Sequence, residues 1–165
     1  MFEDILATVR TFVQKEVVPR EQEIEEIDAI PDEIRKKAAA IGLFGYALPE
    51  EYGGMGFTMH EDVRLAMELG RTTPAFRSMI STNNGIAGQV VARYGTSEQK
   101  ENYLPRLASG ELVGSFALTE VDAGSDPTGL RTTAVRDGDY YILNGTKRYI
   151  TNAPLAGVFL SLIHI

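Results

Sequence analysis

The sequence predicts an α+β protein in which an all-helical N-terminal domain is followed by a partial antiparallel β domain. Through the first two thirds of the 165 residues, apolar side chains recur at helical spacing. After Gly110 the pattern changes to an alternation of period two, as in a strand. The change of period lies near Glu111, so we divide the chain into domains at 1–112 and 113–165.

About five helices are expected from apolar spacing and flanking residues. The predicted segments are 2–18, 31–41, 58–70, 75–94 and 96–108. Pro19 should stop the first helix, with an extra turn near Arg20–Ile27, and Gly42 should end the second. Pro105 should kink or shorten the last helix, because proline has no backbone N–H to donate.

Capping boxes mark the start of two of these helices. Thr58 is followed three residues later by Glu61, and Thr96 by Gln99. In such a pair each side chain accepts a hydrogen bond from a backbone N–H that the helix leaves without a partner. Both positions are therefore predicted helix starts.

Turn signals divide the last third of the chain into short strands. The predicted strands are 113–119, 131–136, 140–143, 147–151 and 158–163. Asp137-Gly138 should form the turn between the second and the third strand. Asn144-Gly145 is typical of a two-residue hairpin and should lead into the fourth strand.

Composition narrows the class of protein. The formal net charge of −7 argues against a general nucleic-acid binder, which needs a basic face. No apolar run approaches the roughly 20 residues that span a bilayer, so no membrane partner is expected. The N-terminus resembles neither a secretory leader nor a transit peptide, and the chain contains no cysteine. We expect a cytoplasmic location.

Sequence motifs exclude several kinds of catalytic site. The chain has neither the G-x-G-x-x-G of a Rossmann site nor a P-loop, and the glycines at 53, 54 and 56 indicate a plain turn. His60 and His164 lack the spacing of metal ligands. Ser115 does not lie in a nucleophile elbow. We assign no metal ligand.

The loop Thr119–Asp126 combines small residues with hydroxyl groups. Small side chains at 123–125 would let a ligand approach the backbone, whose successive N–H groups could form an anion-binding concavity. Thr151 is expected at another strand end, two residues after Tyr149. Such a set suits a flat heterocycle joined to a phosphate. A Gly/Ser turn with ordinary strand threonines explains the same pattern.

Two longer motifs carry a resemblance to a known family. Residues 116–126 read F-A-L-T-E-V-D-A-G-S-D, and residues 137–153 read D-G-D-Y-Y-I-L-N-G-T-K-R-Y-I-T-N-A. Both closely resemble the flavin-binding segment of acyl-CoA dehydrogenases. Motifs at 41–45, 48–56, 68–71 and 95–111 resemble, in order, the helical N-terminal domain of that family. The resemblance covers nearly the whole chain and implies FAD as cofactor.

The resemblance implies a role for each residue of these two motifs. Phe116–Ser125 would line the isoalloxazine and pyrophosphate of FAD, and Tyr149–Thr151 would form a second wall. The implied cofactor-binding residues are Phe116, Leu118, Thr119, Gly124, Ser125, Tyr149, Ile150 and Thr151. Thr119 would meet the flavin ring edge, and Thr151 would hydrogen-bond near flavin N5. Ser125 would also touch the CoA part of the substrate.

Two residues depart from the family pattern. Tyr149 stands where many members carry Trp, so an aromatic wall is kept and the indole N–H is lost. Val121 replaces the usual proline, which should loosen the loop.

The activity implied by the resemblance is α,β-dehydrogenation of an acyl-CoA to the trans-2-enoyl-CoA. A carboxylate removes the α-proton, the flavin takes the β-hydride, and electrons pass to an electron-transfer flavoprotein. The family's base is a Glu on a C-terminal helical bundle, and Glu120 does not match it, so we assign no catalytic residue. The family also implies a homotetramer or dimer.

The end of the chain is expected to be truncated before that bundle. Residues 160–165 form an apolar run that departs from the family pattern, which suggests a truncated or misread sequence. The isolated chain is therefore expected to be inactive and to bind FAD weakly or not at all. Two alternatives stay open at this point. One is a flavin-dependent oxidase or monooxygenase of the same fold, and the other is a non-catalytic helical module that binds a partner.

Overall fold

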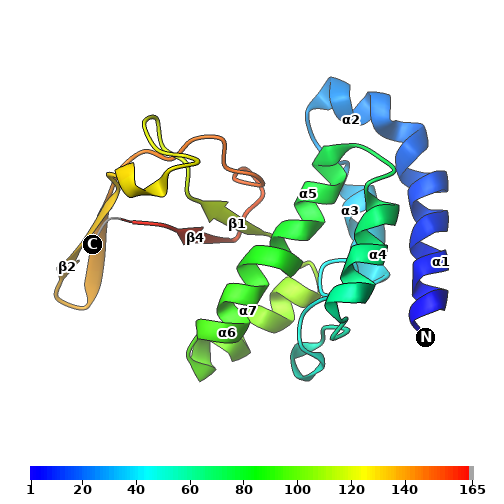
Figure 1. Ribbon diagram of the computed structural model, residues 1–165, viewed down its shortest axis with the longest axis horizontal. Coiled ribbons are helices and arrows are strands. Elements are labelled where there is room, and N and C mark those ends of the chain that lie inside the picture. The colour runs from blue at the N-terminus through cyan, green and yellow to red at the C-terminus, as the bar shows by residue number, and fades with distance from the viewer. Residues whose placement is uncertain (164–165) are drawn as a thin grey trace.

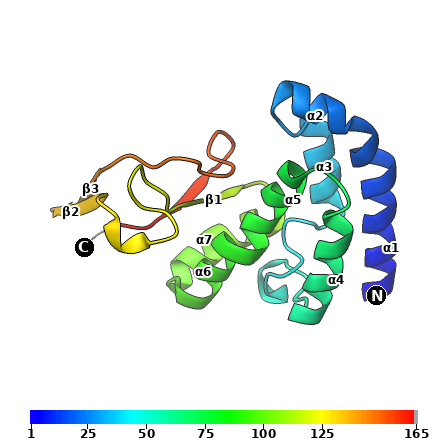
Figure 2. The same ribbon diagram turned by 45° about the horizontal axis from the view of Figure 1, so that its top comes forward.

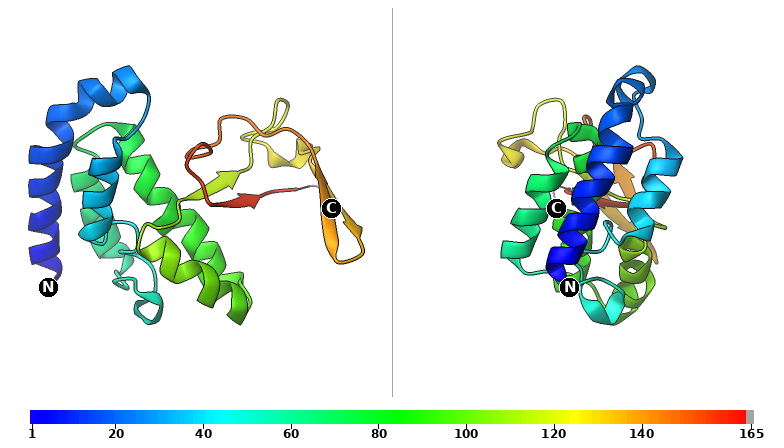
Figure 3. Two further views of the ribbon diagram at one scale, coloured as in Figure 1. Left: turned by 180° about the vertical axis from the view of Figure 1, so that it is seen from behind. Right: turned by 90° about the vertical axis from the view of Figure 1, so that its right-hand side faces the viewer.

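The computed structural model describes residues 1–163, and it places a helical part beside a smaller part built of strands (Figure 1). Helices occupy the chain up to Ala108, and strands begin at Gly114, so the predicted α+β class is confirmed. Figure 3 shows that the strands extend away from one side of the helical part. The interpretation of His164, and the end of the apolar run 160–165, lie outside the described residues.

The helices follow the predicted order. They are α1 (Phe2–Phe12), α2 (Glu21–Ile27), α3 (Asp32–Ala40), α4 (Met59–Leu69), α5 (Pro74–Ser81), α6 (Gly88–Tyr94) and α7 (Ser97–Ala108). A π-helical turn, Thr82–Ala87, joins α5 to α6, so the predicted helix 75–94 is one run with an irregular centre. The expected extra turn after Arg20 is α2. In Figure 2, α6 and α7 lie side by side, in agreement with their packing.

Two expectations about where proline ends a helix were wrong. The first helix does not stop at Pro19, because a π turn (Val13–Val17) and a 3₁₀ turn (Val18–Arg20) carry the chain on into α2. Pro19 lies in the first turn of that 3₁₀ segment, where no N–H is needed. Pro105 does not shorten α7 either. The carbonyl that it leaves without a donor belongs to Glu101, which is exposed, so water can bond to it.

Both predicted capping boxes are confirmed. Thr58 Oγ1 accepts the Glu61 N–H at 3.4 Å, and Glu61 Oε2 accepts the Thr58 N–H at 2.8 Å. The second box has the same form, with 3.2 Å from the Gln99 N–H to Thr96 Oγ1 and 2.9 Å from the Thr96 N–H to Gln99 Oε1. These contacts fix where α4 and α7 begin.

Replacing one cap should have a moderate effect on stability. We expect Thr96→Ala to lower the free energy of unfolding by about 1 kcal/mol, because one N–H at the start of α7 loses its acceptor. Urea denaturation followed by circular dichroism measures the change. Ser97→Ala is the matched control, since the Ser97 hydroxyl has no hydrogen-bond partner within residues 1–163. Equal losses in the two variants would contradict the capping role.

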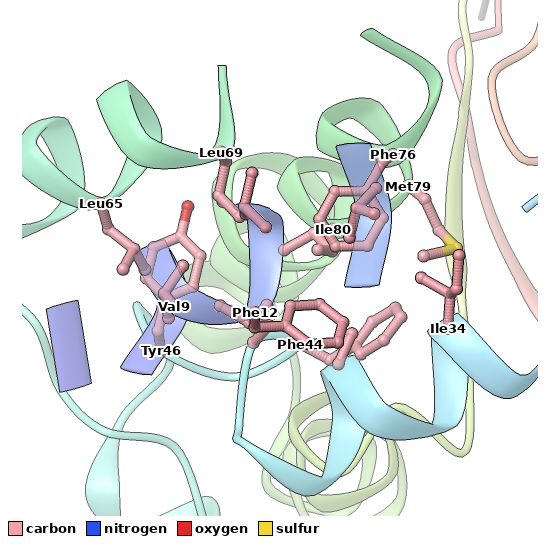
Figure 4. Packing of buried hydrophobic residues seen from close by; sticks show 14 of the residues in the cluster. Val9, Phe12, Ile34, Phe44, Tyr46, Leu65, Leu69, Phe76, Met79 and Ile80 are labelled. Carbon is pink, nitrogen blue, oxygen red and sulfur yellow. The ribbon is translucent and has the colours of Figure 1, made fainter. Parts of the chain in front are cut away.

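The main hydrophobic core lies between α1, α3, α4 and α5, as Figure 4 shows. Its labelled members are Val9, Phe12, Ile34, Phe44, Tyr46, Leu65, Leu69, Phe76, Met79 and Ile80. Burying one such side chain favours folding by about 1.5–3 kcal/mol. Phe76, Met79 and Ile80 all belong to α5, so the core holds this helix in place. None of the helices within residues 1–163 is long and apolar enough to cross a membrane.

The strands form two separate pairs. β2 (Thr133–Asp137) and β3 (Tyr140–Asn144) are antiparallel, with Thr133 opposite Asn144. The turn between them is Gly138-Asp139, one residue later than the predicted Asp137-Gly138. β1 (Gly114–Ala117) and β4 (Val158–Ser161) instead run parallel, with Gly114 opposite Val158. The antiparallel expectation therefore holds for the hairpin and was wrong for the pair that adjoins the helices.

The predicted strand 147–151 and the hairpin turn before it were wrong. Tyr149 and Asn152 have φ angles of 56° and 65°, in the left-handed region, so this segment cannot be extended throughout. Gly145 makes no turn. A Cβ at this position would collide with the Thr132 side chain, so glycine permits a close approach here.

Candidate functional site

The structure brings the two predicted motifs side by side. The Arg148 N–H donates to the Thr119 carbonyl at 2.9 Å, and Ser115 Oγ donates to the Thr151 carbonyl at 2.6 Å. Thr119 and Ser115 belong to the stretch that includes β1 and the loop after it, whereas Arg148 and Thr151 belong to the segment before β4. The two walls are thus joined at two points along their length.

Three hydroxyl groups predicted to bind a ligand have no partner among the described residues. They belong to Thr119, Ser125 and Thr151. Thr119 is half-buried, whereas Ser125 and Thr151 are exposed. Within residues 1–163, no backbone N–H from 121 to 126 has an acceptor. The Ser125 hydroxyl belongs to the loop that carries these free amides, and Thr119 contacts that loop at Gly124, so these groups form a donor set that fits a phosphate-bearing ligand.

The remaining predicted residues lie around this donor set. A Cβ added to Gly124 would stand 3.8 Å from Thr119 Cγ2, which places Gly124 against Thr119. Phe116, Leu118 and Ile150 are half-buried, so part of each side chain is open to solvent. Tyr149 is 79% exposed, and the Arg148 guanidinium lies 4.2 Å from the centre of its ring. One face of Tyr149 is therefore covered by a cation.

A buried ion pair, Glu120 with Lys147, supports both walls. Lys147 Nζ donates to Glu120 Oε1 at 2.8 Å, to the Leu118 carbonyl at 3.0 Å and to the Leu162 carbonyl at 2.6 Å. The side chains of Lys147 and Glu120 are only 12% and 8% exposed. Lys147 thus fixes the backbone of the first wall from a position two residues before Tyr149.

The Glu120 carboxylate is held by donors from a third segment as well. It accepts the Arg131 N–H at 2.7 Å, the Thr132 N–H at 3.0 Å, and the Thr132 hydroxyl. The hydrogen bond from Lys147, followed by those from the Thr132 hydroxyl and the Arg131 N–H, lowers the pKa of Glu120 to about 2. A carboxylate with so low a pKa is a poor general base at neutral pH. The donors around Glu120 give it a structural role as an anion.

This lowered pKa predicts a pH dependence of stability. The pKa of Glu120 is about 2 in the folded chain, below its ordinary value of 4.5. Its stabilising contribution is therefore complete above its ordinary pKa and is lost as the pH falls toward its folded pKa. We expect the melting temperature of Glu120→Gln to fall less steeply than that of the wild type across this window. Thermal melts over this pH range test the expectation, with exposed Glu98→Gln as the control. Parallel profiles of wild type and Glu120→Gln would contradict it.

Lys147 is a residue whose role the sequence reasoning missed. Part of its signal was present, because the first motif contains the acidic residues Glu120, Asp122 and Asp126, and the second contains the adjacent basic residues Lys147 and Arg148. Oppositely charged residues within otherwise apolar motifs often pair when the motifs meet. Pairing was not predicted, because the register between the two segments is set by the left-handed turns at Tyr149 and Asn152.

A pocket of about 390 Å³ opens beside the second wall. From the helical part it is lined by residues 28–30 after α2 and by Pro74, Ser78 and Met79 of α5, and from the other side by Thr151, Asn152 and Leu155. The predicted flavin contact Thr151 therefore borders a largely apolar space against α5.

Comparisons with known proteins match both parts of the chain. The profile of the acyl-CoA dehydrogenase N-terminal domain matches residues 2–111, and that of the acyl-CoA dehydrogenase middle domain matches residues 115–164. An acyl-CoA dehydrogenase of Bacillus subtilis is 37% identical over 153 residues, which is 93% of this chain and 40% of the relative. An acryloyl-CoA reductase (NADH) of Anaerotignum propionicum is 44% identical over 92% of this chain and 39% of its own length.

A solved structure has the same fold. A glutaryl-CoA dehydrogenase from Mycobacterium smegmatis, in complex with FADH₂, superposes with a TM-score of 0.91 at 40% identity. The alignment covers 99% of this chain and 42% of that protein. The chain thus spans about two fifths of the length of the relatives that it matches.

Proposed function

Because this chain belongs to the acyl-CoA dehydrogenase family, we propose that the full-length protein carrying it is an FAD-dependent oxidoreductase that converts an acyl-CoA to the trans-2-enoyl-CoA. The observation that best supports this is the meeting of the two flavin-type motifs, with unpartnered hydroxyls and free amides on them. In the family fold, the same segments would face FAD. When bound, the flavin would supply hydride acceptance.

We propose a role for each residue of the two walls. The amides of 121–126 and the Ser125 hydroxyl would hold the pyrophosphate, and Ser125 would also contact the CoA. Thr119 and Thr151 would bond to the ring system. Support comes from the absence of other partners for these hydroxyls among the described residues. The wall residues in this proposal are Phe116, Leu118, Thr119, Gly124, Ser125, Tyr149, Ile150 and Thr151.

The acyl chain of the substrate has a candidate location in the pocket beside α5. Its lining is mainly apolar, with Pro74, Met79 and Leu155, although Asp28 and Ser78 also line it. Its border at Thr151 would put the reacting carbons next to the flavin. Orientation of the thioester would then depend on this chain's own residues, which hold the cofactor and exclude water. The general base would be a carboxylate from another part of the full-length protein.

Further features of the proposal follow from family membership. The electron acceptor would be an electron-transfer flavoprotein, the protein would form a homotetramer or dimer, and its location would be cytoplasmic. Its metabolic role would lie in fatty acid metabolism. We also keep the division into a helical domain, 1–112, and a β domain, 113–165, supported by the change from helix to strand between Ala108 and Gly114.

The reverse reaction is a second candidate. The relative from Anaerotignum propionicum, at 44% identity, is an acryloyl-CoA reductase (NADH). A flavin site of the same build could therefore reduce a 2-enoyl-CoA in this protein. The two walls are compatible with both dehydrogenation and reduction, because they would position the flavin and do not determine which molecule donates electrons to it.

The experiment is an assay of the purified full-length protein loaded with FAD. Dehydrogenation requires bleaching of the flavin by an acyl-CoA and reoxidation by an electron-transfer flavoprotein. Reduction instead requires NADH oxidation that depends on a 2-enoyl-CoA. Rapid reoxidation by oxygen alone would favour an oxidase. A full-length protein that binds no FAD would overturn the proposal.

A further inference from the structure

The backbone at Thr151 is held by the start of β1. Ser115, whose side chain is fully buried, donates from Oγ to the Thr151 carbonyl at 2.6 Å. The next residue, Asn152, donates from Nδ2 to the Gly114 carbonyl at 3.3 Å. Thr151, at the end of the second wall, and the residue after it are thus bonded to two consecutive residues of the first strand.

The same part of β1 is held from the helical domain by Asn83. This residue lies in the π-helical turn between α5 and α6, and it is 0% exposed. Its Oδ1 accepts the Gly114 N–H at 2.7 Å, while its Nδ2 donates to the carbonyls of Leu107 and Leu112 at 3.0 and 2.9 Å. A Cβ on Gly114 would collide with Ala87, so glycine is required for this close packing. Both polar backbone groups of Gly114 are therefore bound by asparagine side chains.

Asn152 also reaches α5 directly. Its Nδ2 lies 3.3 Å from the Met79 carbonyl, and Met79 lines the pocket that Thr151 borders. Figure 1 shows the segment before β4 approaching α5. The φ of 65° at Asn152 is one that asparagine tolerates better than most residues. One amide group therefore connects the second wall, the first strand and the helix of the pocket.

We propose that Asn152 is a positioning residue, whose amide, shared between the carbonyls of Met79 and Gly114, sets where the Thr151 hydroxyl stands relative to the pocket along α5. This inference rests on the proposed function, because Thr151 gains its importance from the flavin. Asn152 acts through its neighbour. Ser115 holds the carbonyl of the peptide group that joins Thr151 to Asn152, and the Asn152 amide holds the residue that follows, so a change at Asn152 turns this peptide group and with it the backbone of Thr151.

Two substitutions distinguish the effect of the Asn152 side-chain amide from the effect of the backbone conformation at this residue. Asn152→Gly keeps the left-handed φ accessible and removes both hydrogen bonds. Asn152→Asp keeps the shape and replaces the donor by a carboxylate that faces two carbonyl oxygens. Asn144→Asp is the control, because Asn144 is exposed and its side chain has no hydrogen-bond partner within residues 1–163.

Two measurements are made on the full-length protein. The first is amide hydrogen exchange of residues 149–153 without FAD, and the second is the visible circular dichroism of bound FAD with its rate of reduction by an acyl-CoA. For Asn152→Gly and Asn152→Asp we expect faster exchange, an altered flavin spectrum, and roughly tenfold slower reduction. The melting temperature should change little in Asn152→Gly, and the control should match the wild type throughout.

The outcomes distinguish this inference from the proposed function. Wild-type protein that binds no FAD would overturn the proposed function, and unchanged exchange at 149–153 in Asn152→Gly would still overturn the inference by itself. If the wild type is reduced normally and Asn152→Gly has the same spectrum and rate, the inference alone fails. If Asn152→Asp does not fold, the exchange, flavin spectrum and reduction rate of Asn152→Gly alone test the inference.

Discussion

Lys147→Met is expected to abolish tight FAD binding and to lower the melting temperature of the full-length protein by roughly 5–10 °C. The substitution keeps most of the side-chain volume and removes the charge. Glu120 would then stay ionised in a nearly buried position without its cation, and the carbonyls of Leu118 and Leu162 would lose their donor. Because Leu118 adjoins the Thr119 hydroxyl, the first wall should lose its shape.

Isothermal titration with FAD and thermal melts measure the two effects. We expect the dissociation constant to rise at least about tenfold, equivalent to about 1.4 kcal/mol. Lys15→Met is the matched control, since Lys15 is exposed and lies on α1's continuation, away from both walls. A Lys147→Met protein that binds FAD as tightly as the wild type would refute the supporting role of the ion pair.

Local signals in the sequence were sufficient to predict most helix boundaries. The capping boxes at Thr58 and Thr96 fix helix starts through contacts within four residues, and Gly42 ends α3 with a φ of 78°. Such interactions depend only on neighbours in the chain. The hairpin between β2 and β3 was predictable for the same reason, with its turn one residue later than expected.

Features that depend on distant partners were not predictable. Alternation of residues in 158–163 indicates a strand but does not say that β4 pairs with β1 in parallel. The strand expected at 147–151 does not form, because Lys147 pairs with Glu120 and the chain adopts a left-handed conformation at Tyr149. The roles of Asn83 and Asn152 are likewise set by partners at least 24 residues away, such as Leu107 and Met79.

Thr151→Val is expected to slow reduction of the flavin by roughly 10- to 100-fold, while the melting temperature stays nearly unchanged. Valine has the same shape and lacks only the hydroxyl. Thr151 Oγ1 has no hydrogen-bond partner within residues 1–163, and its carbonyl would still accept from Ser115. The fold therefore loses no hydrogen bond among the described residues, whereas, in the proposed site, a bound flavin would lose a donor near its hydride-accepting atom.

Stopped-flow reduction by an acyl-CoA without oxygen measures this rate directly. Thr146→Val is the control, because Thr146 is exposed in the loop after β3 and does not line the pocket. A low reduction rate together with unchanged FAD affinity would place the Thr151 hydroxyl at the reacting end of the flavin. Equal rates of flavin reduction in Thr151→Val and wild type would show that the Thr151 hydroxyl has no role in hydride transfer. The apolar pocket between α5 and the second wall would then have to orient the substrate without it.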